Sequence, residues 1–284
     1  SALVSLFYHW GIIQRVVGAF SWVLRKFMNI SGAEGLVTSG NIFMGMTESP
    51  VLIKNYLPTM NRSEIFLVMV SGMGTIAGSV MGTYIGMLGG TDPAAKVLFA
   101  THLLSASVMA VPGSIVLAKM LCPQTEEATD HVAISGKEKE NSNILDAISS
   151  GTVTGVKLMT NIAAMLLVFI SLVALANYIT EGVIGRYTGL NDWIVKITDG
   201  KAQGLTFQFI LGVITSPFMW LIGVPSQDIM LVGSLLGQKT ILNEFVAYFQ
   251  LQQWKDAGLF MYEKSILMST YILCGFANIS SIGI

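Results

Sequence analysis

Two glutamates lie within apolar stretches that small and polar residues interrupt. Glu48 belongs to NIFMGMTESP (41–50), and Glu244 belongs to LNEFVAYF (242–249). An ionised carboxylate inside a membrane costs at least about 2.5–3.5 kcal/mol, so it indicates a cavity, a partner or a bound solute. A carboxylate also accepts strong charge-assisted hydrogen bonds, which suits a ligand with vicinal hydroxyl groups. Structural roles stand beside this hypothesis, because Glu48 could cap a half-helix and Glu244 could pair with Lys239.

Uncharged polar side chains accompany both carboxylates. Asn41 precedes Glu48, Asn243 adjoins Glu244, and GFANISS (275–281) adds an amide and hydroxyls near the end of the chain. Each could form a helix–helix hydrogen bond or bind a solute. No serine, histidine and aspartate form a plausible catalytic set, and no glycine-rich phosphate loop follows a strand. We therefore expect that the protein is not an enzyme.

The elements that carry these residues are strongly apolar. Charged residues make up 12% of the chain, against about 25% in soluble domains. At 1.5 Å per residue, a run of 20 residues crosses a hydrocarbon core of about 30 Å as a helix. Five runs of at least this length contain no Asp, Glu, Lys or Arg: 65–91, 97–118, 158–180, 202–227 and 265–284. This pattern predicts an all-α, polytopic membrane protein, and the net charge of −1 offers no basic face for nucleic acid.

Some of these elements are broken. Residues 31–58 contain Gly40, Gly45 and Pro50, which predicts two half-helices that meet at a tip in a re-entrant hairpin. The run 65–91 has a glycine at every fourth position from Gly74 to Gly90, which permits close packing and also unwinding near Thr75.

A second half-polar stretch, 225–249, precedes a final span that is interrupted at 275–281. Matched interruptions in two halves are typical of an inverted-repeat transporter core with a site at the membrane midplane. The fold class that we predict is thus all-α, with two re-entrant hairpins and two interrupted transmembrane helices.

The chain divides into five predicted regions. The first is the end of a span plus an interfacial helix, the second a hairpin with an interrupted span and the span after it, and the third a hydrophilic loop. The fourth is a span with an interface segment, and the fifth is the second hairpin region with its interrupted span. Their boundaries are 1–30, 31–121, 122–146, 147–201 and 202–284. The chain opens and stops within apolar sequence, so we expect further spans before Ser1 and after Ile284.

Five motifs carry a resemblance to a known family. They are NIFMGMTESP (41–50), GTIAGS (74–79), LIGVPSQD (221–228), TILNEFVAY (240–248) and CGFANISS (274–281). In this order and spacing they resemble the concentrative nucleoside transporter family, and in particular its bacterial sodium-dependent symporters. The resemblance implies a homotrimer in the cell inner membrane, with a scaffold region and a transport region built from two hairpins and two interrupted helices.

The same resemblance implies roles for individual residues. The nucleobase end of the site would include Gly45, Met46, Thr47, Glu48 and Val80, with Phe276 beside the base. The ribose hydroxyls would bind Glu244, Asn278 and Ser281. Sodium would bind Asn41 and Thr75 through side chains, and Met44 and Ile76 through backbone carbonyls. The family's GQTE reads Gly-Met-Thr-Glu here, so Met46 replaces an amide that can hydrogen-bond a base edge and is expected to change base preference.

The function implied is secondary active import of nucleosides by sodium symport with an elevator-type movement. Proton coupling is an alternative, and so is a symporter for another small polar solute. A carboxylate or amino-acid substrate is disfavoured, because no arginine falls in the motif regions and two glutamates there would repel an anion. A membrane receptor that binds a solute without transporting it is a further alternative.

Overall fold

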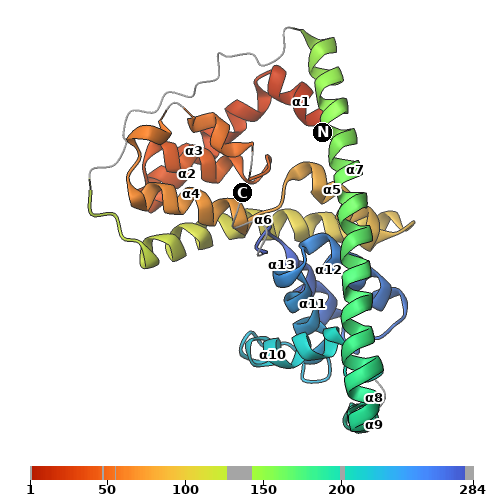
Figure 1. Ribbon diagram of the computed structural model, residues 1–284. Helices are drawn as coiled ribbons and strands as arrows, with labels where there is room; N and C mark the ends of the chain where they lie inside the picture. The colour runs from red at the N-terminus through yellow and green to blue at the C-terminus, as the bar shows by residue number, and fades with distance from the viewer. Residues whose placement is uncertain (1, 47, 55, 127–142, 199–201, 279–284) are drawn as a thin grey trace.

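The computed structural model describes residues 2–46, 48–54, 56–126, 143–198 and 202–278, which form helices and the segments that connect them (Figure 1). The predicted all-α class is confirmed for these residues, which contain no strand. The elements are α1 (Ala2–His9), α2 (Ile12–Met28), α3 (Gly32–Gly40), η1 (Ser49–Ile53), η2 (Leu57–Thr59), α4 (Arg62–Gly74), α5 (Gly78–Gly89), α6 (Pro93–Leu121), α7 (Ile144–Asn177), η3 (Tyr178–Gly185), α8 (Arg186–Thr188), α9 (Leu190–Ile197), α10 (Phe207–Leu221), α11 (Ile229–Ile241), α12 (Glu244–Asp256) and α13 (Glu263–Leu273).

Two long helices set the dimensions of the molecule. Helix α7 runs as a rod along one side in Figure 1, with α1 packed against it and α8 and α9 at its lower end. Helix α6 has 29 residues, about 43 Å at 1.5 Å per residue, and continues through Pro112. Within the described residues, α6 and the segment 167–188 are the helices long and apolar enough to cross a membrane.

Helix α2 has two distinct faces. Ile13 and Val17 are buried, whereas the large side chains of Trp22 and Phe27 are exposed. Arg25 is in its last turn, where a cation interacts favourably with the helix dipole. Helix α2 lies within the region 1–30, for which the sequence predicts an interfacial helix.

The first broken element follows α2. A capping box between Ser31 and Glu34 starts α3, which ends at Gly40. Residues 41–48, called the first tip below, then lead into the short helix η1, which packs against α3.

Helices α4 and α5 are two parts of one interrupted helix. A capping box between Asn61 and Glu64 starts α4. Residues 75–77, called the first break, are extended at Thr75, and α5 resumes at Gly78. The break lies where the glycine pattern predicted unwinding.

The second half of the chain repeats this order. Helices α11 and α12 are joined by Leu242 and Asn243, called the second tip, and Asn243 caps α12 by accepting a hydrogen bond from Val246 N at 2.8 Å. Helix α13 follows and ends at Leu273, so the second break comprises residues 274–278. The end of the predicted span 265–284 lies outside the described residues.

A buried carboxylate ties each hairpin-like pair to the interrupted helix that follows it. Glu34 of α3 forms an ion pair with Lys119 at 2.5 Å, and Lys119 also donates to Ser63 Oγ at the start of α4. Asp228 before α11 accepts hydrogen bonds from the backbone N–H groups of Met261 and Tyr262, just before α13. Both carboxylates are almost fully buried, so both halves depend on their pairing.

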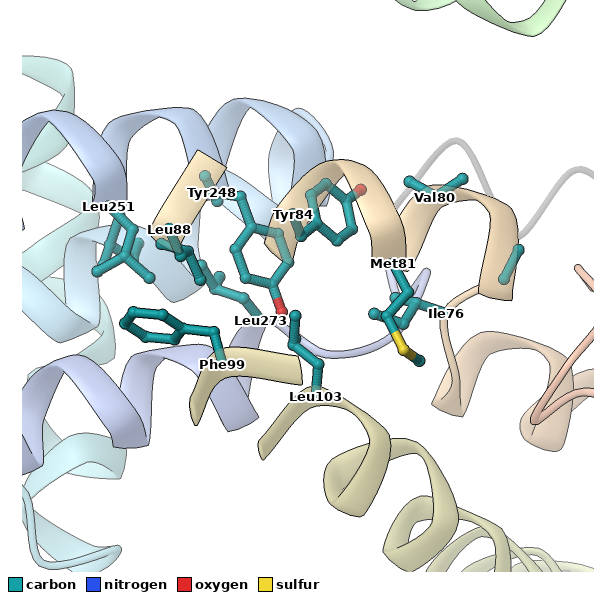
Figure 2. Packing of buried hydrophobic residues seen from close by; sticks show 13 residues of the cluster. Ile76, Val80, Met81, Tyr84, Leu88, Phe99, Leu103, Tyr248, Leu251 and Leu273 are labelled. Atoms are coloured by element: carbon teal, nitrogen blue, oxygen red, sulfur yellow. The ribbon is translucent and has the colours of Figure 1, made fainter. Parts of the chain in front are cut away.

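The largest apolar cluster joins the two halves. It contains side chains of α5, α6, α11, α12 and α13, and Figure 2 shows Tyr84 and Tyr248 side by side among leucines. The two tyrosine rings are stacked with centroids 4.1 Å apart. Tyr84 follows the first break and Tyr248 follows the second tip, so this core holds both polar regions at a fixed separation.

The second break also lies against the end of α4, just before the first break. A Cβ atom added at Gly275 would lie 2.8 Å from Met73 O and 2.9 Å from Gly74 O, closer than side chains pack. Gly275 has φ +125°, a conformation that favours glycine. Only a residue without a side chain lets the second break approach the end of α4 this closely.

We expect Gly275→Ala to destabilise the full-length protein by about 1–3 kcal/mol, because it combines backbone strain with contact against two carbonyl oxygens. The thermal unfolding midpoint in detergent is the measurement. Gly82→Ala is the control, since a Cβ atom there meets no atom within 4 Å. Equal midpoints for the two variants would show that the breaks do not pack as described.

Candidate functional site

The first tip and the first break are joined by three polar side chains, Asn41, Ser71 and Thr75, called the first cluster. Asn41 Nδ2 donates to Ser71 Oγ at 3.0 Å, and Thr75 Oγ1 donates to Asn41 O at 3.0 Å. Phe43 O accepts a hydrogen bond from Gly78 N at 3.3 Å, where α5 resumes. Two of the predicted cation ligands, Asn41 and Thr75, are therefore in direct contact.

Oxygen atoms in this region lack hydrogen-bond donors. Asn41 Oδ1 and Ser49 Oγ are buried and have no hydrogen-bond partner among the described residues. A buried acceptor without a partner is costly, and hard cations such as sodium prefer oxygen ligands. The predicted ligands Met44 and Ile76 lie in the same tip and break, with buried side chains. This set of oxygen ligands fits a small hard cation.

The predicted base-binding residues of the first tip are more open. Glu48 is exposed and precedes η1 without a side-chain capping bond, so the capping role considered for it is not observed. Gly45 O accepts the N–H groups of Glu48 and Ser49, both at 3.0 Å, which forms the turn. Met46 lies against α4, because a Cβ atom at Gly72 would be 3.1 Å from Met46 Cβ. Thr47 lies outside the described residues.

The second tip and the second break form a second cluster around Glu244. The Glu244 side chain is buried, and its two oxygens accept from Asn278 Nδ2 at 3.1 Å and from Tyr84 Oη at 3.4 Å. We call Tyr84, Glu244 and Asn278 the second cluster. Glu244 is in the first turn of α12, where the helix dipole favours a negative charge. Ser281 lies outside the described residues.

Lys239 does not form the ion pair with Glu244 that was considered for it. Its Nζ donates instead to Ile272 O at 3.0 Å, and no ion pair within 4 Å joins it to a carboxylate of the described residues. Glu244 is thus bound by a phenol and an amide, whose hydrogen bonds a hydroxylated ligand can replace or extend.

Apolar groups complete the surroundings of the second cluster. Val80 belongs to the core cluster that contains Tyr84, and Phe276 packs against that cluster. Tyr84 and Tyr248 were missed by sequence reasoning. Each is a tyrosine in an otherwise apolar stretch. A buried tyrosine hydroxyl usually has a hydrogen-bond partner, so such a tyrosine could have indicated a nearby polar group. Tyr248 Oη donates to Thr270 O at 2.9 Å, near the end of α13.

A separate cavity lies elsewhere in the molecule. It has a volume of about 600 Å³ and lies between α7, η3 and α9 on one side and α10, α11 and α12 on the other. Among the described residues, polar side chains such as Glu181, Gln208 and Gln250 line it, together with Trp254. None of the predicted site residues contributes to its lining.

Two families match different parts of the chain. Residues 102–284 match the family described as Na+ dependent nucleoside transporter C-terminus. Residues 1–91 match a family described as nucleoside recognition, named Gate.

Individual relatives match along nearly the whole chain. An uncharacterized transporter of Haemophilus influenzae is 37% identical over 287 residues, which are 100% of this chain and 64% of that protein. Sodium/nucleoside cotransporter 2 of Rattus norvegicus is 37% identical over 296 residues, which are 99% of this chain and 42% of that protein. The chain therefore spans less than two thirds of the length of these relatives.

Solved structures agree with these matches. The protein named CNTnw in an inward-facing substrate-bound state is 34% identical with a TM-score of 0.83, covering 99% of this chain and 62% of that one. A doubly substituted variant of the same protein in an outward-facing state gives a TM-score of 0.86, covering 99% and 63%. The chain belongs to the family of sodium-dependent nucleoside transporters.

Proposed function

We propose that the full-length protein imports nucleosides by sodium symport. The observation that carries this proposal is the contact of Gly275 in the second break with the end of α4, because it puts an oxygen-rich cluster next to a cluster built on a buried carboxylate. A cation and a hydroxylated solute can then bind on neighbouring surfaces. The relatives named as sodium/nucleoside cotransporters support the choice of cation and solute.

The second cluster is the proposed sugar site. A carboxylate held by Asn278 and Tyr84 can accept hydrogen bonds from the two ribose hydroxyls, while the amide of Asn278 supplies a donor. Ser281 is proposed as a further hydroxyl contact, and Phe276 as the aromatic contact beside the base.

The first tip is the proposed base site. Glu48 is exposed and Met46 is partly exposed, so both are available to a ligand. Gly45 allows the tip to turn, and Thr47 and Val80 are proposed to contact the base. Met46 brings apolar contact in place of an amide, so the base edge is expected to rely on Thr47 and Glu48.

Coupling would arise through the first cluster. A sodium ion bound by Asn41, Thr75 and the carbonyls of Met44 and Ile76 would order the first tip against the first break. The tip carries the proposed base contacts, so cation binding would increase nucleoside affinity, and by linkage the nucleoside would increase cation affinity equally.

The transport movement is proposed to be of the elevator type. The two hairpins, α3–η1 and α11–α12, would be re-entrant and would move with the interrupted helices past a scaffold that includes α7, in the regions delimited above. Similarity to inward-facing and outward-facing structures of one relative supports a fold that is compatible with both states. We also propose a homotrimer in the bacterial inner membrane and no catalytic activity.

Substitution of the buried carboxylate tests the sugar site. We expect Glu244→Gln in the full-length protein to lower nucleoside uptake at limiting substrate roughly 10- to 150-fold, because a charge-assisted hydrogen bond contributes about 1.5–3 kcal/mol. Tyr84→Phe removes only a 3.4 Å neutral donor and should cost much less. Radiolabelled uridine uptake into proteoliposomes is the measurement. Glu263→Gln at the exposed start of α13 is the control, and uptake by Glu244→Gln equal to that control would refute the assignment.

Removal of one cation ligand tests the coupling. We expect Thr75→Ala to raise the sodium concentration for half-maximal uptake several-fold, because a hydroxyl ligand and its bond to Asn41 O are both lost. Thr83→Ala on the exposed face of α5 should leave that concentration unchanged. Uptake measured against sodium, with choline as replacement, gives the value. A sodium dependence identical in both variants would place the cation elsewhere, and activation by protons alone would favour the proton-coupled alternative.

Base selectivity should depend on Met46. We expect Met46→Gln to increase the preference between nucleosides that differ in the hydrogen-bonding edge of the base, because it adds an amide donor and acceptor. A competition panel of unlabelled nucleosides against radiolabelled uridine measures this. Leu57→Gln, on an exposed surface of η2, is the control. Unchanged ranking in the panel would mean that position 46 does not contact the base.

A further inference from the structure

Lys239 is a buried cation that the proposed mechanism does not use. It is 5% exposed, lies in the last turn of α11 and donates to Ile272 O at 3.0 Å. Among the described residues no carboxylate lies within ion-pairing distance of its ammonium group. A buried charge without a counter-ion is costly, so its position requires a physical reason.

The end of α13 supplies that reason. The last carbonyls of a helix have no intrahelical N–H partner and form the negative end of the helix dipole. Here they are satisfied by three separate donors: Thr270 O by Tyr248 Oη, Tyr271 O by Cys274 N, and Ile272 O by the Lys239 ammonium. The Lys239 ammonium is therefore the positively charged group at the carboxyl end of α13, where the second break begins.

The first half has a related arrangement, in which the buried group is a hydrogen-bond acceptor and not a cation. At the end of α3, Asn41 reaches Ser71 in the last turn of α4, just before the first break. Its amide oxygen is buried and has no donor among the described residues. The first half thus presents a buried oxygen without a donor among the described residues, whereas in the second half an ammonium group donates to a helix-end carbonyl.

We propose that the Lys239 ammonium is a built-in cation, which occupies in the second half the place that a transported sodium ion occupies in the first. This inference rests on the proposed function. It makes Lys239 a residue that determines ion stoichiometry: one mobile sodium ion per nucleoside, with the second positive charge fixed to the protein. Lys239 is in the last turn of α11, before the second tip, and Glu244 begins α12 after it.

Sodium binding to the purified full-length protein tests this without transport. The unfolding midpoint in detergent is followed while sodium replaces choline at constant ionic strength, since a ligand that binds the folded state raises the midpoint. Wild type is expected to respond as a single site. Lys239→Gln keeps most of the side-chain length and adds an oxygen, so it should bind a second sodium ion. At saturating sodium, the rise of the midpoint with the logarithm of the sodium concentration should then become about twice as steep as in wild type. Lys239→Arg, which keeps the charge, and Lys264→Gln, at an exposed position, should resemble wild type.

A second substitution separates this inference from the proposed function. Asn41→Ala removes the first cation ligand. The double variant with Asn41→Ala and Lys239→Gln should still be stabilised by sodium, whereas the Asn41→Ala single variant should not. Loss of response in both would overturn the Lys239 inference and leave the first sodium site standing. If sodium raises the midpoint of the Asn41→Ala single variant as much as that of wild type, the first sodium site is wrongly assigned. The additional rise in the midpoint caused by Lys239→Gln would then still test the role of Lys239.

Wild type provides a measurement that does not depend on the folding of any variant. The charge carried per nucleoside into proteoliposomes is counted from paired current and radiolabel measurements. One positive charge per uridine is expected. Two charges would overturn the inference, because a second mobile cation would then bind despite Lys239.

Discussion

A break in a buried helix leaves backbone carbonyl and N–H groups that water cannot reach, and the rest of this structure depends on how those groups are satisfied. In the first tip, Phe43 O accepts a hydrogen bond from Gly78 N, and Asn41 O accepts one from Thr75 Oγ1. The second break has its helix end bound by Tyr248 and Lys239. The second break then meets the end of α4 at Gly275, whose missing side chain permits the approach. Removing any of these contacts would leave polar backbone without partners in an apolar core.

Helix α5 connects the two halves physically. Its first residue, Gly78, is bound to the first tip. Six residues later, Tyr84 reaches Glu244 at the start of α12 and stacks on Tyr248. A change in the first break therefore has a direct packed route to the carboxylate of the second cluster. Interaction between two ligands requires such a shared element, and α5 is one that both proposed binding sites contact.

The sequence predicted the helical class, the breaks and most of the polar residues that meet. Charge-free runs and regularly placed glycines carry that information locally, because each depends on the cost of burying charge or of bending a helix. The residues at which the helices begin and end were less predictable. Helix α7 begins at Ile144, well before the apolar run at 158, because the capping residue Asn143 starts it in polar sequence. Helix α13 ends at Leu273 inside an apolar run, because Gly275 turns the chain away.

Residue types and hydropathy are local properties, and they suffice to place two carboxylates, several amides and two sets of breaks in strongly apolar surroundings. By residue type and hydropathy, Glu48 and Glu244 are alike, since each is a carboxylate in an interrupted apolar stretch. In the folded chain Glu48 is exposed, whereas Glu244 is buried between Tyr84 and Asn278. Folding also gives Lys239 a helix end as its partner in place of Glu244. These outcomes depend on contacts between residues 33 to 160 positions apart, which no local pattern encodes.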